Sequence, residues 1–386
     1  MLEEHFLTEE QVMIRDLSRR IAEEKIVPIR AELDETGEFP HDIVKELAAS
    51  DLFGVFIPEE YGGFGGGIKE MCIVTEELSR ACGGIALAYA ATGLGAFPIL
   101  LYGNKEQKKK YLGQIAKGES LAAFGLTEPD AGSDAGAIKT RAKKVDGGYE
   151  ITGNKIFITN GSEADIYTVV AVTDPTRGAR GASTFIVEKG VDGFSFGKKE
   201  DKMGIRASVT SELVFEDCFV PEENLLGREG LGFMVAMKTF DQSRPGVAAQ
   251  ALGIAQGALD EAVKYARQRE QFGKPVASFQ GMKWMLADMA TKLEAARSLV
   301  YRSAEYVDAG AKNVSKLSAM AKCYASDIAM EITTDAVQVL GGYGYMREYP
   351  VEKMMRDAKI TQIYEGTNQI QRDIIATNLY KEYKNR

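Results

Sequence analysis

The amino-acid sequence predicts a mainly α-helical protein with a β-sheet domain in the middle of the chain. Residues 1–120 and 232–386 show the three- and four-residue spacing of apolar side chains that is typical of helices, whereas residues 121–231 hold short runs rich in β-branched and aromatic residues. A chain of 386 residues is long enough to bury a sizeable core in two or three domains. We therefore expect a helical N-terminal domain, a central β domain and a helical C-terminal domain with these boundaries.

The N-terminal domain is expected to begin with a capped helix. Thr8 is followed three residues later by Gln11, which is the spacing of a capping box, in which each side chain satisfies a backbone N–H of the other residue. Met13, Leu17 and Ile21 then recur at four-residue spacing and predict one apolar face. Helical spacing continues to about residue 120, so the first domain is predicted to be all-helical.

The middle of the chain has the pattern of a β domain. Three strand-like runs stand at residues 165–173, 182–190 and 211–220, and Gly, Pro and Asp separate them. Each run lies too close to the next to leave room for a crossover helix, which parallel neighbours need. The sequence therefore predicts a small antiparallel sheet and disfavours a parallel, doubly wound one.

The C-terminal domain carries the seam of a helix bundle. After Gln280, apolar residues follow a 3-4-3-4 spacing that places them on one face of a helix. The residues of this face are Leu286, Met289, Leu293, Ala296 and Val300. Such a face is expected to pack into a core, and we assign it no chemistry.

Charge and composition exclude several classes of protein. The net charge is −9, and Lys and Arg are scattered along the chain, so a nucleic-acid partner is not expected. We expect no membrane span, because no run of about 20 apolar residues stands out. The acidic first residues have the features of neither a secretory signal nor a transit peptide, which predicts a cytoplasmic protein. The four cysteines lack CxxC spacing and are expected to be free thiols.

The sequence also narrows the possible chemistry. His5 and His41 are the only histidines, so neither a catalytic triad nor a metal site is expected, and His41 follows Pro40 at a predicted helix start on the surface. No GxxxxGK loop is present, and the glycine cluster at residues 340–350 lacks the third glycine of GxGxxG. An organic cofactor assisted by a carboxylate is the remaining route to difficult chemistry.

Four segments, in this order, resemble those of the acyl-CoA dehydrogenase family, most closely its short- and medium-chain members. They are FGLTEPDAGSD at residues 124–134, KIFITNG at 155–161, RQREQFGKPVASFQ at 267–280, and the region from QVLGGYG to IYEGTNQIQR at 338–372. The resemblance covers nearly the whole chain. It implies a helical N-terminal domain, a central β domain and a C-terminal four-helix bundle, in agreement with the pattern of the sequence.

By this resemblance the cofactor is FAD, which lies between the β domain and the bundle and reaches a neighbouring subunit of a homotetramer. The flavin is expected to contact one set of residues: Phe124, Leu126, Thr127, Ser133, Phe157, Ile158, Thr159, Thr367 and Gln369. The cofactor of the next subunit is expected to contact another set: Arg269, Phe272, Gln280, Gln338, Gly341 and Gly342. Simpler interpretations stay open for four of them: Phe157 also fits the core of a β domain, the two glycines fit a helix-ending turn, and Thr127 fits a turn before Glu128 and Pro129.

The resemblance further implies that Glu365 removes the α proton of an acyl-CoA thioester, while the β hydrogen leaves as a hydride and the trans-2-enoyl-CoA forms. Burial should raise the pKa of this carboxyl group toward the working range. Five residues are expected to contact the substrate: Ser133, Asp241, Arg244, Tyr364 and Gly366. Asp241 and Arg244 also fit a surface ion pair of i,i+3 spacing on a helix.

Some members of the family carry the base within the segment that here reads FDQSR, at the position of Ser243, which cannot act as a base. The reduced cofactor is expected to pass its electrons to an electron-transferring flavoprotein. Thr92, Gly93 and Gly95 are expected to shape the acyl end of the pocket. Two alternatives stay open: a specialised dehydrogenase or reductase of a cyclic or carboxylated acyl-CoA and, more remotely, a non-catalytic helical scaffold.

Overall fold

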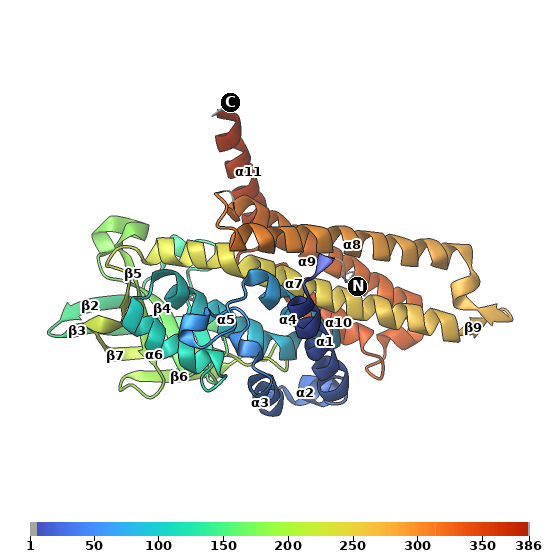
Figure 1. Cartoon of the computed structure of the whole chain (residues 1–386), viewed down its shortest axis with the longest axis horizontal. Coiled ribbons are helices and arrows are strands. Elements are labelled where there is room, and N and C mark those ends of the chain that lie inside the picture. The colour runs from blue at the N-terminus through green and yellow to red at the C-terminus, as the bar shows by residue number, and fades with distance from the viewer. Residues whose placement is uncertain (1–5, 313, 385–386) are drawn as a thin grey trace.

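The computed structural model describes residues 6–312 and 314–384, so His5 lies outside the described residues. A β-sheet domain occupies one end of the molecule, and long helices extend toward the other end (Figure 1). The N-terminal helices pack along one side of these long helices, and the last helix projects from the other side. The prediction of a mainly helical protein, with a sheet domain formed by the middle of the sequence, is therefore confirmed.

The N-terminal third is helical throughout. Its α-helices are α1 (Glu9–Ile21), α2 (Arg30–Thr36), α3 (His41–Ala49), α4 (Ile68–Ala81), α5 (Gly83–Tyr102) and α6 (Lys105–Ala116). The capping box is confirmed, because Thr8 and Gln11 exchange hydrogen bonds between side chain and backbone. The predicted apolar face is partly wrong: Ile21 is buried, but the Met13 side chain is 64% exposed. Gln11, Arg15 and Ser18 fill the buried face instead, because α1 packs against α4 through polar contacts such as the Arg19–Glu77 ion pair.

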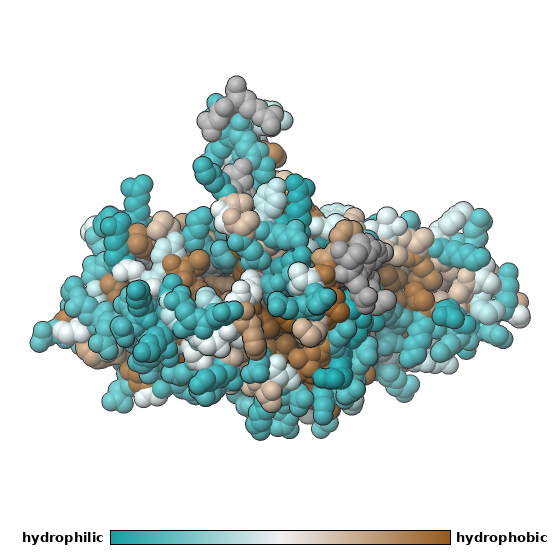
Figure 2. Space-filling view, in the orientation of Figure 1, coloured by the Kyte–Doolittle hydropathy of each residue, from teal (hydrophilic) through white to brown (hydrophobic). Residues whose placement is uncertain are grey.

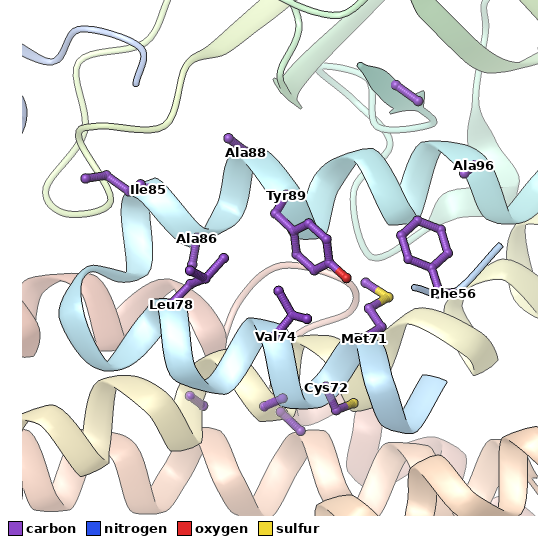
Figure 3. Packing of buried hydrophobic residues seen from close by; sticks show 14 of the residues in the cluster. Phe56, Met71, Cys72, Val74, Leu78, Ile85, Ala86, Ala88, Tyr89 and Ala96 are labelled. Carbon is purple, nitrogen blue, oxygen red and sulfur yellow. The ribbon is translucent and has the colours of Figure 1, made fainter. Parts of the chain in front are cut away.

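Helix α5 corrects the expectation that the chain has no long apolar run. Its 20 residues include no charged side chain and are long and apolar enough to cross a membrane. However, 78% of its most apolar window is buried, and Figure 3 shows Ala86 and Tyr89 of this helix beside Leu78 and Val74 of α4. On the face shown in Figure 2, hydrophilic residues predominate around a smaller apolar patch. Helix α5 is thus a central core helix.

The sheet domain contains the three predicted strands and five others. The strands are β1 (Ala122–Gly125), β2 (Arg141–Val145), β3 (Gly148–Thr159), β4 (Ile166–Val172), β5 (Ala182–Glu188), β6 (Phe194–Lys199), β7 (Thr210–Pro221) and β8 (Leu225–Leu226). Their order is β6-β7-β3-β2-β4-β5-β8, with β1 added beside β4. Most pairs are antiparallel, but β1 and β2 each run parallel to β4, so the sheet is mixed. Strand β1 can pair in parallel with β4 because the β2–β3 hairpin lies between them in the sequence. This hairpin brings the chain back to the end of the sheet at which β1 began.

The C-terminal third consists of α7 (Gly232–Gln268), α8 (Gln280–Asp308), α9 (Val314–Leu340), α10 (Val351–Thr361) and α11 (Asn368–Lys384). Four of the five predicted seam residues of α8 are buried, and Leu286 is partly buried against the same core. Helix α11 is the projecting helix of Figure 1 and buries only Asn368 and Gln371 among its described residues. The division into domains after residues 120 and 231 stays a prediction.

The predicted states of cysteine and histidine are confirmed. All four cysteines, Cys72, Cys82, Cys218 and Cys323, are free and buried. His41 begins α3, and its side chain is 65% exposed.

Candidate active site

A cavity opens where the sheet domain meets helices α5 and α7. Its wall is built by α4, α5, the ends of β1 and β3, α7 and the turn between α10 and α11. Most of the side chains in this wall are apolar, and the polar ones are hydroxyl, amide and carboxyl groups. An enclosed apolar site with a few polar groups is typical of small-molecule and cofactor binding.

Two segments that the sequence singled out share one wall of the cavity. Their six residues are Phe124, Leu126, Thr127, Phe157, Ile158 and Thr159. The segments are joined by the Ile156 N–H, which donates to the Thr127 carbonyl at 2.9 Å. In the described chain the Thr127 and Thr159 hydroxyls make no hydrogen bond to protein, so they are free to bind a ligand.

Phe157 has an unusual backbone conformation. Its φ is +59°, which is rare for a bulky residue, and its side chain is 60% exposed, so the interpretation as a core residue is wrong. The cause is a bulge: the pairing of β3 with β7 shifts register between Lys155 and Ile158. Bulges redirect side chains beside functional sites. This one turns the Phe157 ring into the cavity.

A buried ion pair lies behind the cavity wall that these two segments form. The Lys155 ammonium is fully buried and donates to Glu128 Oε1 at 2.6 Å and to the Leu126 carbonyl at 3.1 Å. Burial lowers the pKa of Lys155 to about 8, although Glu128 opposes this change. Glu128 also accepts the backbone N–H groups of Lys139 and Thr140 at 2.5 and 3.0 Å. Sequence reasoning missed this pair, although both residues stand inside the recognised motifs.

Glu365 enters the cavity from the turn between α10 and α11. Its φ is +52°, and the Ser243 hydroxyl donates a short hydrogen bond to its Oε2 atom. Burial raises the pKa of Glu365, while the hydrogen bond from Ser243 and the charges of Arg244 and Lys322 oppose the rise. The predicted direction of the pKa shift therefore agrees with the structure.

The backbone beside Glu365 is held by three side chains from three helices. Gln371 Nε2 on α11 donates to the carbonyls of Glu365 and Gly366 at 3.1 and 2.8 Å. Arg244 Nε on α7 lies 3.5 Å from the Glu365 carbonyl, and Lys322 Nζ on α9 donates to the Gly366 carbonyl at 2.9 Å. Neither Lys322 nor Gln371 was predicted. Both support the turn from outside the cavity.

Asp241 and Arg244 lie inside the protein, so the alternative of a surface pair is wrong. Their exposed fractions are 6% and 3%, and Arg244 Nη1 lies 3.5 Å from Asp241 Oδ1. Pro245 has no N–H, which leaves the Asp241 carbonyl without its helical partner. The Ser318 hydroxyl of α9 donates to that carbonyl at 3.0 Å, and this bond ties α7 to α9 beside the cavity.

Tyr364 lines the cavity next to the predicted base. Its hydroxyl donates a short hydrogen bond to Gln250 Oε1, and Gln250 Nε2 donates to the Gly83 carbonyl at 2.9 Å. Burial raises the pKa of Tyr364 well above its usual value, so the hydroxyl is neutral. This chain of hydrogen bonds connects the turn to α7 and to the start of α5.

Thr92, Gly93 and Gly95 are not among the residues that line the cavity, so their role in shaping its acyl end stays a prediction. A Cβ atom on Gly93 would lie 2.7 Å from the Met71 side chain, and one on Gly95 would lie 2.6 Å from the Ala123 nitrogen. Thr92 is fully buried. Their small size lets α5 approach α4 and β1. The cavity face of α5 is formed instead by Leu87, Ala90, Ala91 and Leu94.

The residues predicted to hold the far part of a cofactor stand apart from this cavity. Arg269, Phe272 and Gln280 lie at the exposed tip between α7 and α8, at the opposite end of the bundle from the sheet (Figure 1). Gln338, Gly341 and Gly342 are exposed where α9 ends. The two groups are close, because the Arg269 guanidinium lies 5.5 Å from the centre of the Tyr343 ring. Their role in cofactor binding stays a prediction.

Besides Asp241 and Arg244, four further predicted residues do not line the cavity. Ser133 and Gln369 are exposed, and Gly366 points its carbonyl away toward Lys322. The Thr367 hydroxyl accepts the Ile370 N–H at 3.3 Å and so caps α11. Their contacts with cofactor or substrate also stay predictions.

Comparisons with known proteins agree with this architecture. Three domain families match: the N-terminal domain of acyl-CoA dehydrogenases at residues 8–119, the middle domain at 123–218 and the C-terminal domain at 230–380. A short-chain-specific acyl-CoA dehydrogenase of Clostridium acetobutylicum is 51% identical over 377 residues, which are 97% of this chain and 99% of the relative.

Solved structures give the same result. Butyryl-CoA dehydrogenase of Megasphaera elsdenii superposes with a TM-score of 0.95 at 48% identity, covering 97% of this chain and 99% of that chain. A chain in a structure of the electron transferring flavoprotein of Acidaminococcus fermentans gives a TM-score of 0.95 at 52% identity, with 97% and 98% covered. Family, fold and near-complete coverage coincide, and this chain belongs to the acyl-CoA dehydrogenase family.

Proposed function

We propose that this protein oxidises a short-chain acyl-CoA thioester to the trans-2-enoyl-CoA, and that Glu365 is the base that removes the α proton. The observation that carries the proposal is the position of Glu365, which lies in the same cavity as the six wall residues matched to the flavin site. The names of the relatives support a dehydrogenase of short acyl groups. The specialised and non-catalytic alternatives are not favoured.

The wall residues fit a flavin. Two hydroxyls without protein partners, Thr127 and Thr159, provide hydrogen-bond donors, and the exposed ring of Phe157 provides an aromatic surface. FAD, the cofactor of this family, supplies the oxidant that accepts the β hydrogen as a hydride. The apolar side chains of α5 and α7 exclude water from the reacting carbons.

Glu365 suits proton abstraction in this setting. A base is most effective when its pKa lies near the working pH, and burial raises the pKa of this carboxyl group from its usual value. The Ser243 hydroxyl holds one carboxylate oxygen, which orients the other. The proton therefore moves from the α carbon to Glu365.

The wider assembly is part of the same proposal. The electron acceptor would be an electron-transferring flavoprotein, and a cytoplasmic homotetramer is the expected form. The exposed residues at the far end of the bundle, Arg269 among them, would bind the cofactor of a neighbouring copy. A guanidinium suits a diphosphate because it donates hydrogen bonds in pairs.

An anaerobic titration tests the proposal. Oxidised protein is mixed with straight-chain acyl-CoAs of increasing length, and loss of the flavin absorbance is followed. Short acyl-CoAs should bleach the flavin, whereas Glu365→Gln should bind FAD and ligand but react at least about 100-fold more slowly. Glu106→Gln, an exposed change on α6, is the matched control. Full bleaching by Glu365→Gln would refute the assignment of the base.

A further inference from the structure

Lys322 is a buried cation that no function yet explains. Its side chain, on α9, is fully buried, and Nζ donates to the Gly366 carbonyl and to Asn368 Oδ1, each at 2.9 Å. Among the described residues, no carboxylate oxygen lies within 4.0 Å of this ammonium group. Burial of a charge without a close partner is costly, so a hydrophobic residue would serve packing better.

The two contacts of Lys322, to Gly366 and Asn368, both lie directly C-terminal to Glu365. Glu365 and Gly366 both have positive φ, +52° and +93°, and the first of these is unfavourable for a residue with a side chain. Gly366 lies directly after Glu365, and Asn368 begins α11 two residues later. Asn368 is itself held by donating to Ser326 Oγ at 2.8 Å and Asp327 Oδ1 at 2.7 Å. Lys322 thus links the turn to the rigid helix α9.

We propose that Lys322 is a positioning residue for the base: it fixes the Glu365–Gly366 turn in the conformation that directs the carboxylate into the cavity. The proposal rests on the proposed function of Glu365. Lys322 does not line the cavity, so it acts through the turn and not on the substrate.

The charged groups around Lys322 determine its effect on pH dependence. Arg244 faces it from α7 and Glu365 from the turn, while Cys323 and Asp327 belong to α9, and Asp327 is paired with Arg372 of α11 at 2.6 Å. Burial lowers the pKa of Lys322 to about 8, and the negative charge of Glu365 opposes this. In its charged form the Lys322 ammonium holds the pKa of Glu365 down. Loss of this charge should therefore raise the pKa of Glu365.

Two substitutions separate the hydrogen bond from the charge. Lys322→Met removes both, whereas Lys322→Gln keeps a donor but no charge, and Lys316→Met on the same helix, which breaks only the Lys316–Glu382 pair, is the control. FAD-loaded variants are compared for the rate of flavin bleaching between pH 5.5 and 9.5. Exchange of the substrate α proton with deuterated water, followed by NMR, gives a second readout that needs no hydride transfer.

Lys322→Met should bleach and exchange about 10- to 100-fold more slowly than the unsubstituted protein, because a base displaced by about 1 Å loses that much rate. Lys322→Gln should lose less rate, but both variants should move the lower limb of the pH profile to higher pH. The control should match the unsubstituted protein. Unchanged rates and pH profiles in both variants would overturn the inference, as would failure of both to bind FAD, which would assign Lys322 to folding.

The inference and the proposed function fail in different ways. If Glu365→Gln retains bleaching, the base is elsewhere and the proposed function is refuted. If Glu365→Gln is inactive while both Lys322 variants behave like the unsubstituted protein, only the role of Lys322 is refuted.

Discussion

Replacement of Lys155 by Met should destabilise the protein and weaken its binding of FAD. The Lys155 ammonium is fully buried between Glu128 and the Leu126 carbonyl, directly behind the wall that Thr127 and Phe157 form. Met has a similar length but cannot donate a hydrogen bond. The substitution leaves the Glu128 carboxylate buried without its counter-charge.

The size of the effect follows from the contacts that remain. Removal of one partner from a buried ion pair costs about 3–5 kcal/mol. Glu128 keeps two backbone donors, at Lys139 and Thr140, so we expect a loss near the lower limit, about 3 kcal/mol. With an unfolding entropy of ~2.1 cal/mol/K per residue, a chain of 386 residues should unfold about 4 °C lower. Differential scanning calorimetry measures this shift, and fluorescence of released flavin measures FAD loss.

Two further variants show whether the effect comes from the buried charge of Glu128. Lys139→Met removes an exposed ion pair with Asp130, whose two side chains are 73% and 72% exposed, and should leave the unfolding temperature unchanged. The double substitution of Lys155→Met with Glu128→Gln removes the stranded charge and should recover part of the lost stability. The reasoning is refuted if Lys155→Met unfolds at the original temperature, or if the double variant is no more stable than the single one.

Three other predictions each follow from one local feature: a hydrogen bond, a close packing contact and the burial of the cysteines. Ser243→Ala removes the hydrogen bond that lowers the pKa of Glu365, so the acidic limb of flavin bleaching should move to higher pH in stopped-flow measurements; an unmoved limb would contradict this. Gly95→Val should lower the unfolding temperature through a cost of at least about 1–3 kcal/mol, because even a Cβ would lie 2.6 Å from the Ala123 nitrogen; an unchanged temperature would contradict this close packing. All four cysteines are buried, so a thiol reagent should label none of them in native protein within minutes and all of them after unfolding; rapid labelling of native protein would be the contrary result.

The sequence predicted the large elements of the fold because their signals are local. Apolar spacing identified α8 and its seam, and β-branched runs identified β4, β5 and β7. Strand β1 was missed because it has only four residues, AAFG, and forms by pairing with β4, which follows it by about 40 residues. The apolar run of α5 can be read in the sequence and was overlooked there, whereas its burial depends on packing between α4 and the sheet domain, which no local pattern shows.

The candidate site shows the same division between local and distant information. Motifs within single segments predicted Thr127, Phe157 and Glu365, and the structure places all three on one cavity. Lys155 and Lys322 contact groups 27 and 44 residues away in sequence, so neither could be assigned before those segments were seen together. A lysine in a strand or helix usually indicates a solvated face, and only burial reveals these two as structural cations.

The strained residues of the backbone connect these observations. Seven non-glycine residues in the described chain have positive φ, and Phe157, Phe272 and Glu365 are among them. Such conformations cost about 1–3 kcal/mol each and persist only where the surroundings enforce them. At Phe157 the strand bulge lies next to the buried Lys155–Glu128 pair, and at Glu365 the side chains of Lys322, Gln371 and Arg244 contact the backbone of the turn. Each of the two strained residues of the cavity therefore has a buried lysine beside it and outside the cavity, and substitution of either lysine should disturb the site while leaving every cavity-lining side chain in the sequence intact.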